Sequence, residues 1–390
     1  MTSLVNRILC RVSLSLITAA AVTTAAAQQS EIGPTTDAQV QSQNKTKIAL
    51  IVSPKGSVLS EAAAPIQQGI LAASREATAS GACELVQYEL SSPQDAGAVL
   101  KKAADDGAVL AIGPVSRDAV QTISEMPYLP LPVVAINRPS GETAPELFLS
   151  IDISAESEVE QLAKIAVENT AQKADLAANN FVILTTQDPY DERLARAMEA
   201  ALVKAGAGAE RRHISSDQIA YLRQEMRGKA FRGAFFAMNA QNASLLRPYL
   251  PPELPVFGTS YSNPMHQKDS MLAKTQSNDL NGMITLEIPA EENTSTLVAQ
   301  YKGERENLSL EELQMFSVGV DAWTLGTKWI DWARRIEVPD GLTGRLSFDK
   351  DSGSKVKREL VKTVVGPNKT GKASEEDLVQ FTESAEEAGL

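Results

Sequence analysis

Short apolar runs alternate with segments of helical periodicity along most of this 390-residue chain. Residues 47–52 (KIALIV) form a nearly continuous apolar run, as expected for a strand that is covered on both faces. The next segment has small and apolar residues at helical spacing, namely Ile66, Gly69, Ile70 and Ala73. Strands that alternate with helices in this way imply parallel sheets with right-handed crossovers. The sequence therefore predicts an α/β fold.

The alternation occurs in two series, which predicts two Rossmann-like lobes with parallel sheets around a hinged cleft. Strands of the first series are expected at 47–53, 85–90, 108–112, 131–136 and 147–151, and those of the second at 181–185, 211–214, 233–238 and 255–258. Ser309 then begins a capping box and a long helix, and residues 344–349 and 357–365 are predicted to form a β-pair. Because these late elements need a sheet to cover, we expect lobe one to contain 47–152 and about 308–366, and lobe two to contain 153–307.

The two ends of the chain differ from this core. Residues 1–27 combine Arg7 and Arg11, an apolar run and a final Ala-Ala-Ala, as in a signal peptide cleaved after Ala27. Residues 28–46 are predicted to be a flexible tether, and 367–390 a flexible acidic tail. Cys10 precedes the apolar run instead of following it, so we do not expect it to be acylated. A soluble periplasmic protein follows.

The composition excludes several classes of function. The formal net charge of -12 and the pI near 4.9 argue against a general nucleic-acid binder. Two cysteines and two histidines leave little material for a metal site, and no cofactor, catalytic residue or membrane span is predicted. The near match to a phosphate loop at 366–373 has Ala373 where a hydroxyl is needed. Cys83 is expected to be a buried apolar residue.

Ligands of open α/β sheets bind beyond the carboxyl ends of the strands, so the loops at those ends hold the candidate cleft residues. On lobe one these are Ser53, Ser57, Ser116, Asn137 and Arg138, and on lobe two they are Thr186, Asp188, Tyr190, Asn239, Ser260 and Tyr261. Hydroxyls, amides and a few charges of this kind suit a small-molecule pocket. The alternative is that the same residues only cap helices and turn loops.

Several of these segments resemble a known family. The strand at 47–52, the segment 66–73 (IQQGILAA), Ile112-Gly113-Pro114 and 131–137 (LPVVAIN) look like the first lobe of type I periplasmic binding proteins. The later segments 316–323 (FSVGVDAW), 341–347 (GLTGRLS) and 356–360 (VKREL) resemble LppC-type penicillin-binding protein activators. The resemblance covers about residues 46–366.

This resemblance implies a non-catalytic periplasmic protein that binds and regulates a peptidoglycan synthase, with no motif that transfers the partner surface residue by residue. The alternative is a solute receptor for an amino-acid or amide importer. In that case Ser116 and Thr186 would hold the carboxylate of an amino-acid-like ligand, and Asp188 and Tyr190 its amine.

Overall fold

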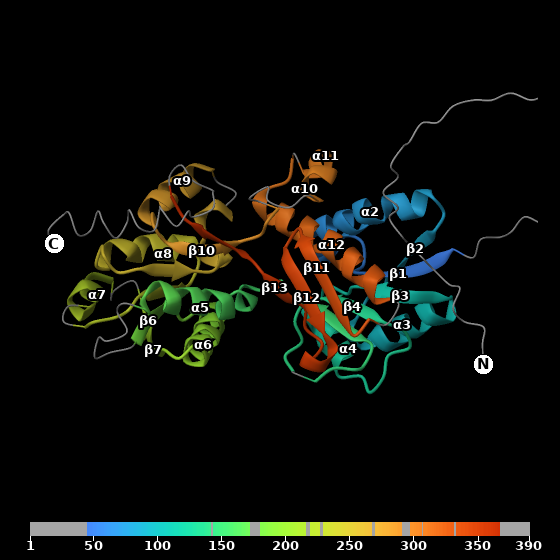
Figure 1. Ribbon diagram of the computed structural model, residues 1–390, viewed down its shortest axis with the longest axis horizontal. Coiled ribbons are helices and arrows are strands. Elements are labelled where there is room, and N and C mark those ends of the chain that lie inside the picture. The colour runs from blue at the N-terminus through green and yellow to red at the C-terminus, as the bar shows by residue number, and fades with distance from the viewer. Residues whose placement is uncertain are drawn as a thin grey trace, which may run out of the picture.

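The computed structural model describes residues 45–141, 143–171, 180–215, 219–226, 229–266, 270–290, 297–305, 307–330 and 333–366. These residues form an elongated molecule with two lobes side by side (Figure 1). The predicted class, two Rossmann-like α/β lobes with parallel sheets, is confirmed. The expected signal peptide, the acidic tail and the tether up to residue 44 lie outside the described residues, and Thr46 already belongs to the first strand.

Lobe one is built on a parallel five-stranded sheet with the order β2-β1-β3-β4-β5. Its strands are β1 (Thr46–Val52), β2 (Cys83–Glu89), β3 (Ala108–Ile112), β4 (Val133–Ile136) and β5 (Phe148–Ile151). Its helices are α1 (Val58–Ala62), α2 (Ala64–Ala79), α3 (Ala96–Asp105), α4 (Arg117–Ser124) and, from late in the chain, α12 (Leu310–Trp329).

Successive residues of β1 face opposite sides of this sheet, which explains its unbroken apolar run. Ile48 and Leu50 pack under α2 and α12, whereas Ala49 and Ile51 pack under α3 and α4. Cys83 on β2 is 4% exposed and belongs to the first of these two layers, so its predicted burial is confirmed.

Lobe two has a six-stranded sheet with the order β14-β10-β9-β8-β6-β7. Its strands are β6 (Asn180–Thr185), β7 (Gly208–His213), β8 (Ala234–Ala237), β9 (Val256–Gly258), β10 (Ile284–Glu287) and β14 (Val361–Val364). Its helices are α5 (Val159–Asn169), α6 (Pro189–Lys204), α7 (Ile219–Met226), α8 (Ala240–Leu246) and α9 (Ser270–Asp279). Helices α5 and α6 cover one face, and α7 and α8 cover the other.

Helix α12 returns the chain to lobe one and lies against α2. The contact is unusually close because Gly69 and Gly319 face the opposing backbone: a Cβ on Gly319 would lie 2.1 Å from the carbonyl oxygen of Ile66. Two short helices, α10 (Leu297–Gln300) and α11 (Lys302–Arg305), precede α12. Glu304 of α11 pairs with Arg75 of α2 at 2.7 Å.

An antiparallel three-stranded sheet follows α12, with β11 (Arg335–Gly341), β12 (Gly344–Asp349) and β13 (Lys357–Glu359) in that order. The predicted pair of 344–349 with 357–365 is therefore right only as far as residue 359. Residues 361–364 form β14, which pairs antiparallel with β10 in the sheet of lobe two. The expected assignment of 308–366 to lobe one is corrected at this point, because the stretch 357–365 is divided between two sheets.

Candidate functional site

Two of the lobe-one candidates cap helices. Ser57 is the N-cap of α1, where its Oγ accepts a hydrogen bond from the Ser60 N–H and donates one to the carbonyl of Pro54. Ser116 is the N-cap of α4 and accepts from the Ala119 N–H at 3.5 Å. Ser53 follows β1 and is half-buried. The helix-capping alternative therefore describes what Ser57 and Ser116 do in this structure.

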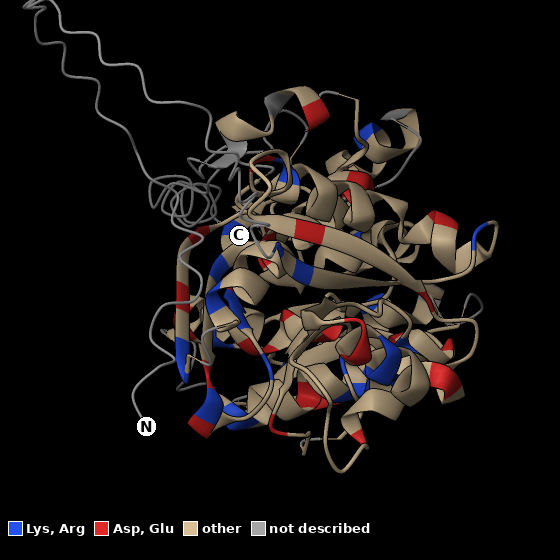
Figure 2. Cartoon of the chain, turned by 90° about the vertical axis from the view of Figure 1, so that its right-hand side faces the viewer, with Lys and Arg blue, Asp and Glu red and all other residues tan. Residues whose placement is uncertain are grey.

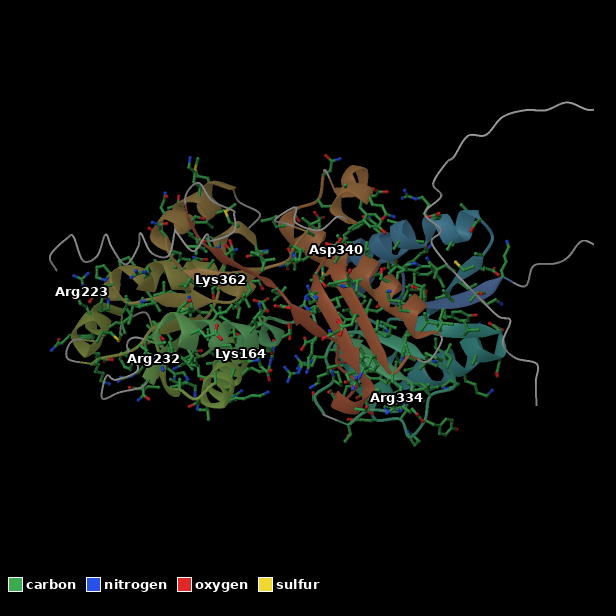
Figure 3. All side chains as sticks on the ribbon, in the orientation of Figure 1. Lys164, Arg223, Arg232, Arg334, Asp340 and Lys362 are labelled. Atoms are coloured by element: carbon green, nitrogen blue, oxygen red, sulfur yellow. The ribbon has the colours of Figure 1, made fainter. Side chains whose placement is uncertain are left out.

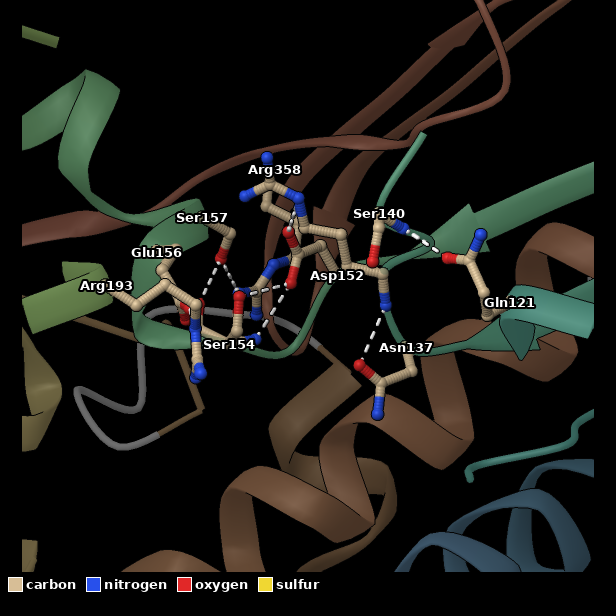
Figure 4. Close-up of polar contacts among 10 residues, drawn as sticks. Gln121, Asn137, Ser140, Asp152, Ser154, Glu156, Ser157, Arg193 and Arg358 are labelled. Carbon is tan, nitrogen blue, oxygen red and sulfur yellow. Dashed lines mark hydrogen bonds and ion pairs between the residues drawn. The ribbon is translucent and has the colours of Figure 1, made fainter. Parts of the chain in front are cut away.

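Asn137 and Arg138 follow β4 and contact neighbouring segments, and Figure 4 labels Asn137. The Asn137 side chain donates to the carbonyl of Val115 at 3.0 Å and accepts from the Arg138 N–H at 2.8 Å. The Arg138 guanidinium lies 3.8 Å from a carboxylate oxygen of Asp152, the residue that follows β5. Arg138 thus reaches the point where the chain leaves lobe one.

Two lobe-two candidates are also helix caps. Asp188 is the N-cap of α6 and accepts from the Tyr190 N–H at 2.7 Å. Asn239 is the N-cap of α8 and accepts from the Asn242 N–H at 2.9 Å. Asp188 and Asn239 thus repeat in lobe two the role that Ser57 and Ser116 have in lobe one.

The other lobe-two candidates are brought together in one polar and aromatic cluster. The Thr186 hydroxyl donates to Asp191, a carboxylate in the first turn of α6 that is 1% exposed. Tyr190 and Tyr261 pack edge to face with their ring centroids 4.8 Å apart, and the Arg193 guanidinium lies over the Tyr190 ring. Burial raises the pKa of Asp191 and of both tyrosines, because it penalises their charged forms.

Ser260 connects β9 to an acid that the sequence did not single out. Its N–H and its hydroxyl donate to the two carboxylate oxygens of Glu158, at 2.7 and 2.5 Å. Glu158 directly precedes α5 and is 6% exposed. Burial raises its pKa to about 7, against the opposing effect of the two hydrogen bonds from Ser260.

Arg358 on β13 lies among acids of three different segments. Its guanidinium donates to the Ser157 hydroxyl at 2.9 Å, and it interacts electrostatically with Glu158, Asp152 and Asp321. Burial lowers its pKa, whereas these carboxylates act in the opposite direction. Figure 4 shows Arg358 beside Asp152 and the turn at Ser154 and Ser157, where the chain passes from one lobe to the other.

Asp321 of α12 binds the turn between β11 and β12. Its carboxylate accepts from the N–H groups of Leu342 and Thr343, at 3.0 and 2.8 Å, and from the Thr343 hydroxyl at 2.6 Å. Burial raises its pKa to about 6. The three late segments that carried the family resemblance contain Asp321, Thr343 and Arg358, so those segments meet at the junction of the lobes.

A small cavity lies at the same junction. Its lining combines polar side chains from several segments with apolar ones: Ile153, Glu158, Ser260, Leu286, Ile288, Gln314, Met315, Val318, Thr343, Arg358 and Leu360. Of the eleven cleft candidates, only Ser260 lines it. Among the remaining candidates, Asn137 bonds the loop that contains Val115, Arg138 pairs with Asp152, and Tyr190 packs on Tyr261.

The described residues were also compared with the requirements of a metal site and of a membrane span. Among the described residues, no group of three or more His, Cys, Asp or Glu is arranged to hold a metal ion. No helix in the described part of the chain is long and apolar enough to cross a membrane. Figure 2 shows basic and acidic residues interspersed on the side that it presents.

His266 forms an ion pair with the buried Glu287 at 3.1 Å. This carboxylate raises the pKa of His266, although burial alone would lower it.

Several solved structures have a fold similar to that of this chain. A putative branched-chain amino acid ABC transporter from Chromobacterium violaceum superimposes with a TM-score of 0.65 at 23% identity, over 82% of this chain and 100% of that one. The LpoA C-domain from Haemophilus influenzae, a regulator of PBP1A, gives 0.64 at 17% identity, over 84% and 98%. Full-length LpoA from the same organism gives 0.65 at 17% identity, over 85% of this chain but 59% of that one.

No curated protein matches the sequence. The family model described as LppC putative lipoprotein, however, matches residues 20–218, just over half of the chain. This match shows that the chain belongs to the LppC family.

Proposed function

We propose that this protein is a non-catalytic periplasmic protein that binds and regulates a peptidoglycan synthase. The observation that carries the proposal is the LppC match combined with a fold that covers 98% of the LpoA C-domain, a regulator of PBP1A. Periplasmic location follows from the predicted signal peptide and agrees with that family.

The hydrogen bonds of the cleft candidates support the same function. Four cleft candidates, Ser57, Ser116, Asp188 and Asn239, are engaged as N-caps of the helices that they precede. A partner protein bound on the outer surface of the lobes would not need to displace these bonds. A small ligand in the cleft would compete with them or use the remaining hydrogen-bonding capacity of the same groups.

The test compares ligand binding with partner binding. We expect no change in melting temperature across a panel of amino acids, amides and short peptides, together with a measurable interaction with the periplasmic part of a peptidoglycan synthase. That interaction should survive Ser116→Ala and Tyr190→Ala. No binding to any synthase of the same organism would contradict the proposal.

The second candidate is a solute receptor for an amino-acid or amide importer. It is favoured by the cluster of Thr186, Asp191, Tyr190 and Tyr261, whose carboxylate and ring faces suit an amine. A ligand present at 100 times its dissociation constant stabilises a receptor by about 2.7 kcal/mol. A melting shift with one amino acid, abolished by Tyr190→Ala, would establish this function instead.

A further inference from the structure

The last of the crossovers between the lobes consists of one residue. β13 ends at Glu359, which pairs with Arg345 of β12, and β14 begins at Val361, which pairs with Glu287 of β10. Leu360 lies between them. Since both of its neighbours are held in sheets of different lobes, a rotation of one lobe against the other has to change backbone torsions at Leu360 or break one of these pairings.

The side chain of Gln161 holds both backbone groups of Leu360. Its Nε2 donates to the Leu360 carbonyl at 2.7 Å, and its Oε1 accepts from the Leu360 N–H at 2.9 Å. These two groups belong to the peptide planes on either side of the Leu360 Cα. Because one planar carboxamide binds both planes, it resists rotation about either backbone torsion of Leu360.

Gln161 is mounted on a helix that is itself firmly anchored. α5 packs on α6 through buried residues such as Leu162, and the carbonyls of Val167 and Thr170 near its end accept hydrogen bonds from the buried Arg232. Figure 3 labels Arg232 and Lys164, which belong to lobe two. The Leu360 side chain is 8% exposed and packs in the same core cluster as α5.

A second contact supports this crossover from the lobe-one side. Arg358, two residues before Leu360, donates to the hydroxyl of Ser157 in the first crossover. The first and last crossovers are therefore joined to each other as well as to α5.

We propose that Gln161 is a clamp that fixes the angle between the two lobes. In the clamped state, the lobes keep one relative orientation, and a rotation about the backbone torsions of Leu360 requires the hydrogen bonds from Gln161 to break. The inference does not depend on the proposed function, because it concerns the chain alone. A fixed angle would suit a protein that presents one surface to a partner.

The test measures the distance between the lobes by pulsed electron spin resonance. Nitroxides are attached at Lys102→Cys on α3 and Gln241→Cys on α8, both exposed, in a Cys10→Ala, Cys83→Ala background of the full chain. We expect one narrow distance distribution for the parent and a broader or two-peaked one for Gln161→Ala. Lys164→Ala, an exposed position on the same helix, is the matched control and should leave the distribution unchanged.

A second readout follows the clamp itself. The amide of Leu360 should exchange about tenfold faster with solvent in Gln161→Ala, because it loses its hydrogen-bond acceptor. Gln161→Glu keeps an acceptor for the Leu360 N–H but cannot donate to the Leu360 carbonyl, so it should give an intermediate distribution even if Gln161→Ala fails to fold. A narrow parental distribution in both folded variants would overturn the proposal, as would a broad distribution in the parent.

Discussion

The two lobes share one architecture but differ in the polar residues beyond their strands. In lobe one, Ser57 and Ser116 cap helices with local hydrogen bonds, and Asn137 binds the neighbouring loop. In lobe two, Asp191 and Glu158 are buried carboxylates with hydroxyl donors from Thr186 and Ser260. The lobe-one candidates thus bind backbone groups of nearby loops, whereas Thr186 and Ser260 of lobe two bind buried carboxylates with raised pKa values.

The largest effect is expected where lobe one is most tightly packed. Gly319→Val places a branched side chain against the backbone of Ile66 on α2, which cannot move aside without separating the two helices. We expect the free energy of unfolding to fall by about 4 kcal/mol or more. Urea denaturation followed by circular dichroism measures this loss.

Gly303→Val is the matched control for this substitution. Gly303 lies in α11, and a Cβ there would meet no atom within 4 Å. Its effect should stay within about 0.5 kcal/mol. Equal losses at Gly303 and Gly319 would show that the close approach of α2 and α12 does not hold lobe one together.

The second largest effect is a pH dependence of the free energy of unfolding, which a buried acid of lobe two should cause. The pKa of Glu158 is raised from 4.5 to about 7 by burial, so the folded state binds this proton more tightly than the unfolded state. The free energy of unfolding should therefore fall as the pH rises from about 4.5 to about 7, by about 3 kcal/mol in total. Glu158→Gln removes this loss, and its amide can still accept from the Ser260 N–H and donate to its hydroxyl.

Denaturant titrations at several pH values measure the difference between Glu158→Gln and the parent. Asp321, whose pKa is also raised, is present in both proteins, so its contribution cancels in that difference. Glu160→Gln changes an exposed acid two residues away and serves as the control. If Glu158→Gln and the parent lost stability in parallel from pH 4.5 to pH 7, Glu158 would not be the buried titrating group.

The smallest effect compares one hydroxyl from each lobe. Thr186→Val removes a donor from the buried Asp191 and should cost about 2 kcal/mol, because a buried carboxylate oxygen loses its partner. Ser116→Ala removes only a 3.5 Å cap bond and should cost about 0.5 kcal/mol. Thermal and urea unfolding of both variants rank the two costs, and the reverse order would contradict the contrast between the lobes.

The α/β class and most strands of both lobes could be predicted from the sequence. Unbroken apolar runs such as Ile48 to Val52 indicate strands that are buried on both faces. The capping alternative for Ser57, Ser116 and Asp188 could also be stated in advance, since it depends on local spacing. β10, β11 and α9 were not anticipated, and β7 begins at Gly208, before the expected range.

The polar junction could not be predicted from local patterns. Glu158, Asp321 and Arg358 are separated by more than 150 residues from first to last, and only the folded chain brings their charges together. The division of 357–365 at Leu360 has the same cause, because β14 pairs with β10, a strand that precedes α12 in the chain. The family resemblance did mark segments that contain Asp321 and Arg358, although it assigned them no role.

The position of β14 has a consequence for the order in which the protein is made. β14 forms the edge of the lobe-two sheet, where Thr363 pairs with Thr285 of β10. Its residues are synthesised after α12 and the small antiparallel sheet, so the ribosome has already produced nearly all of lobe one before lobe two can be completed. Lobe two is therefore unable to finish folding as an independent unit during synthesis, and its last strand arrives only when both lobes are present.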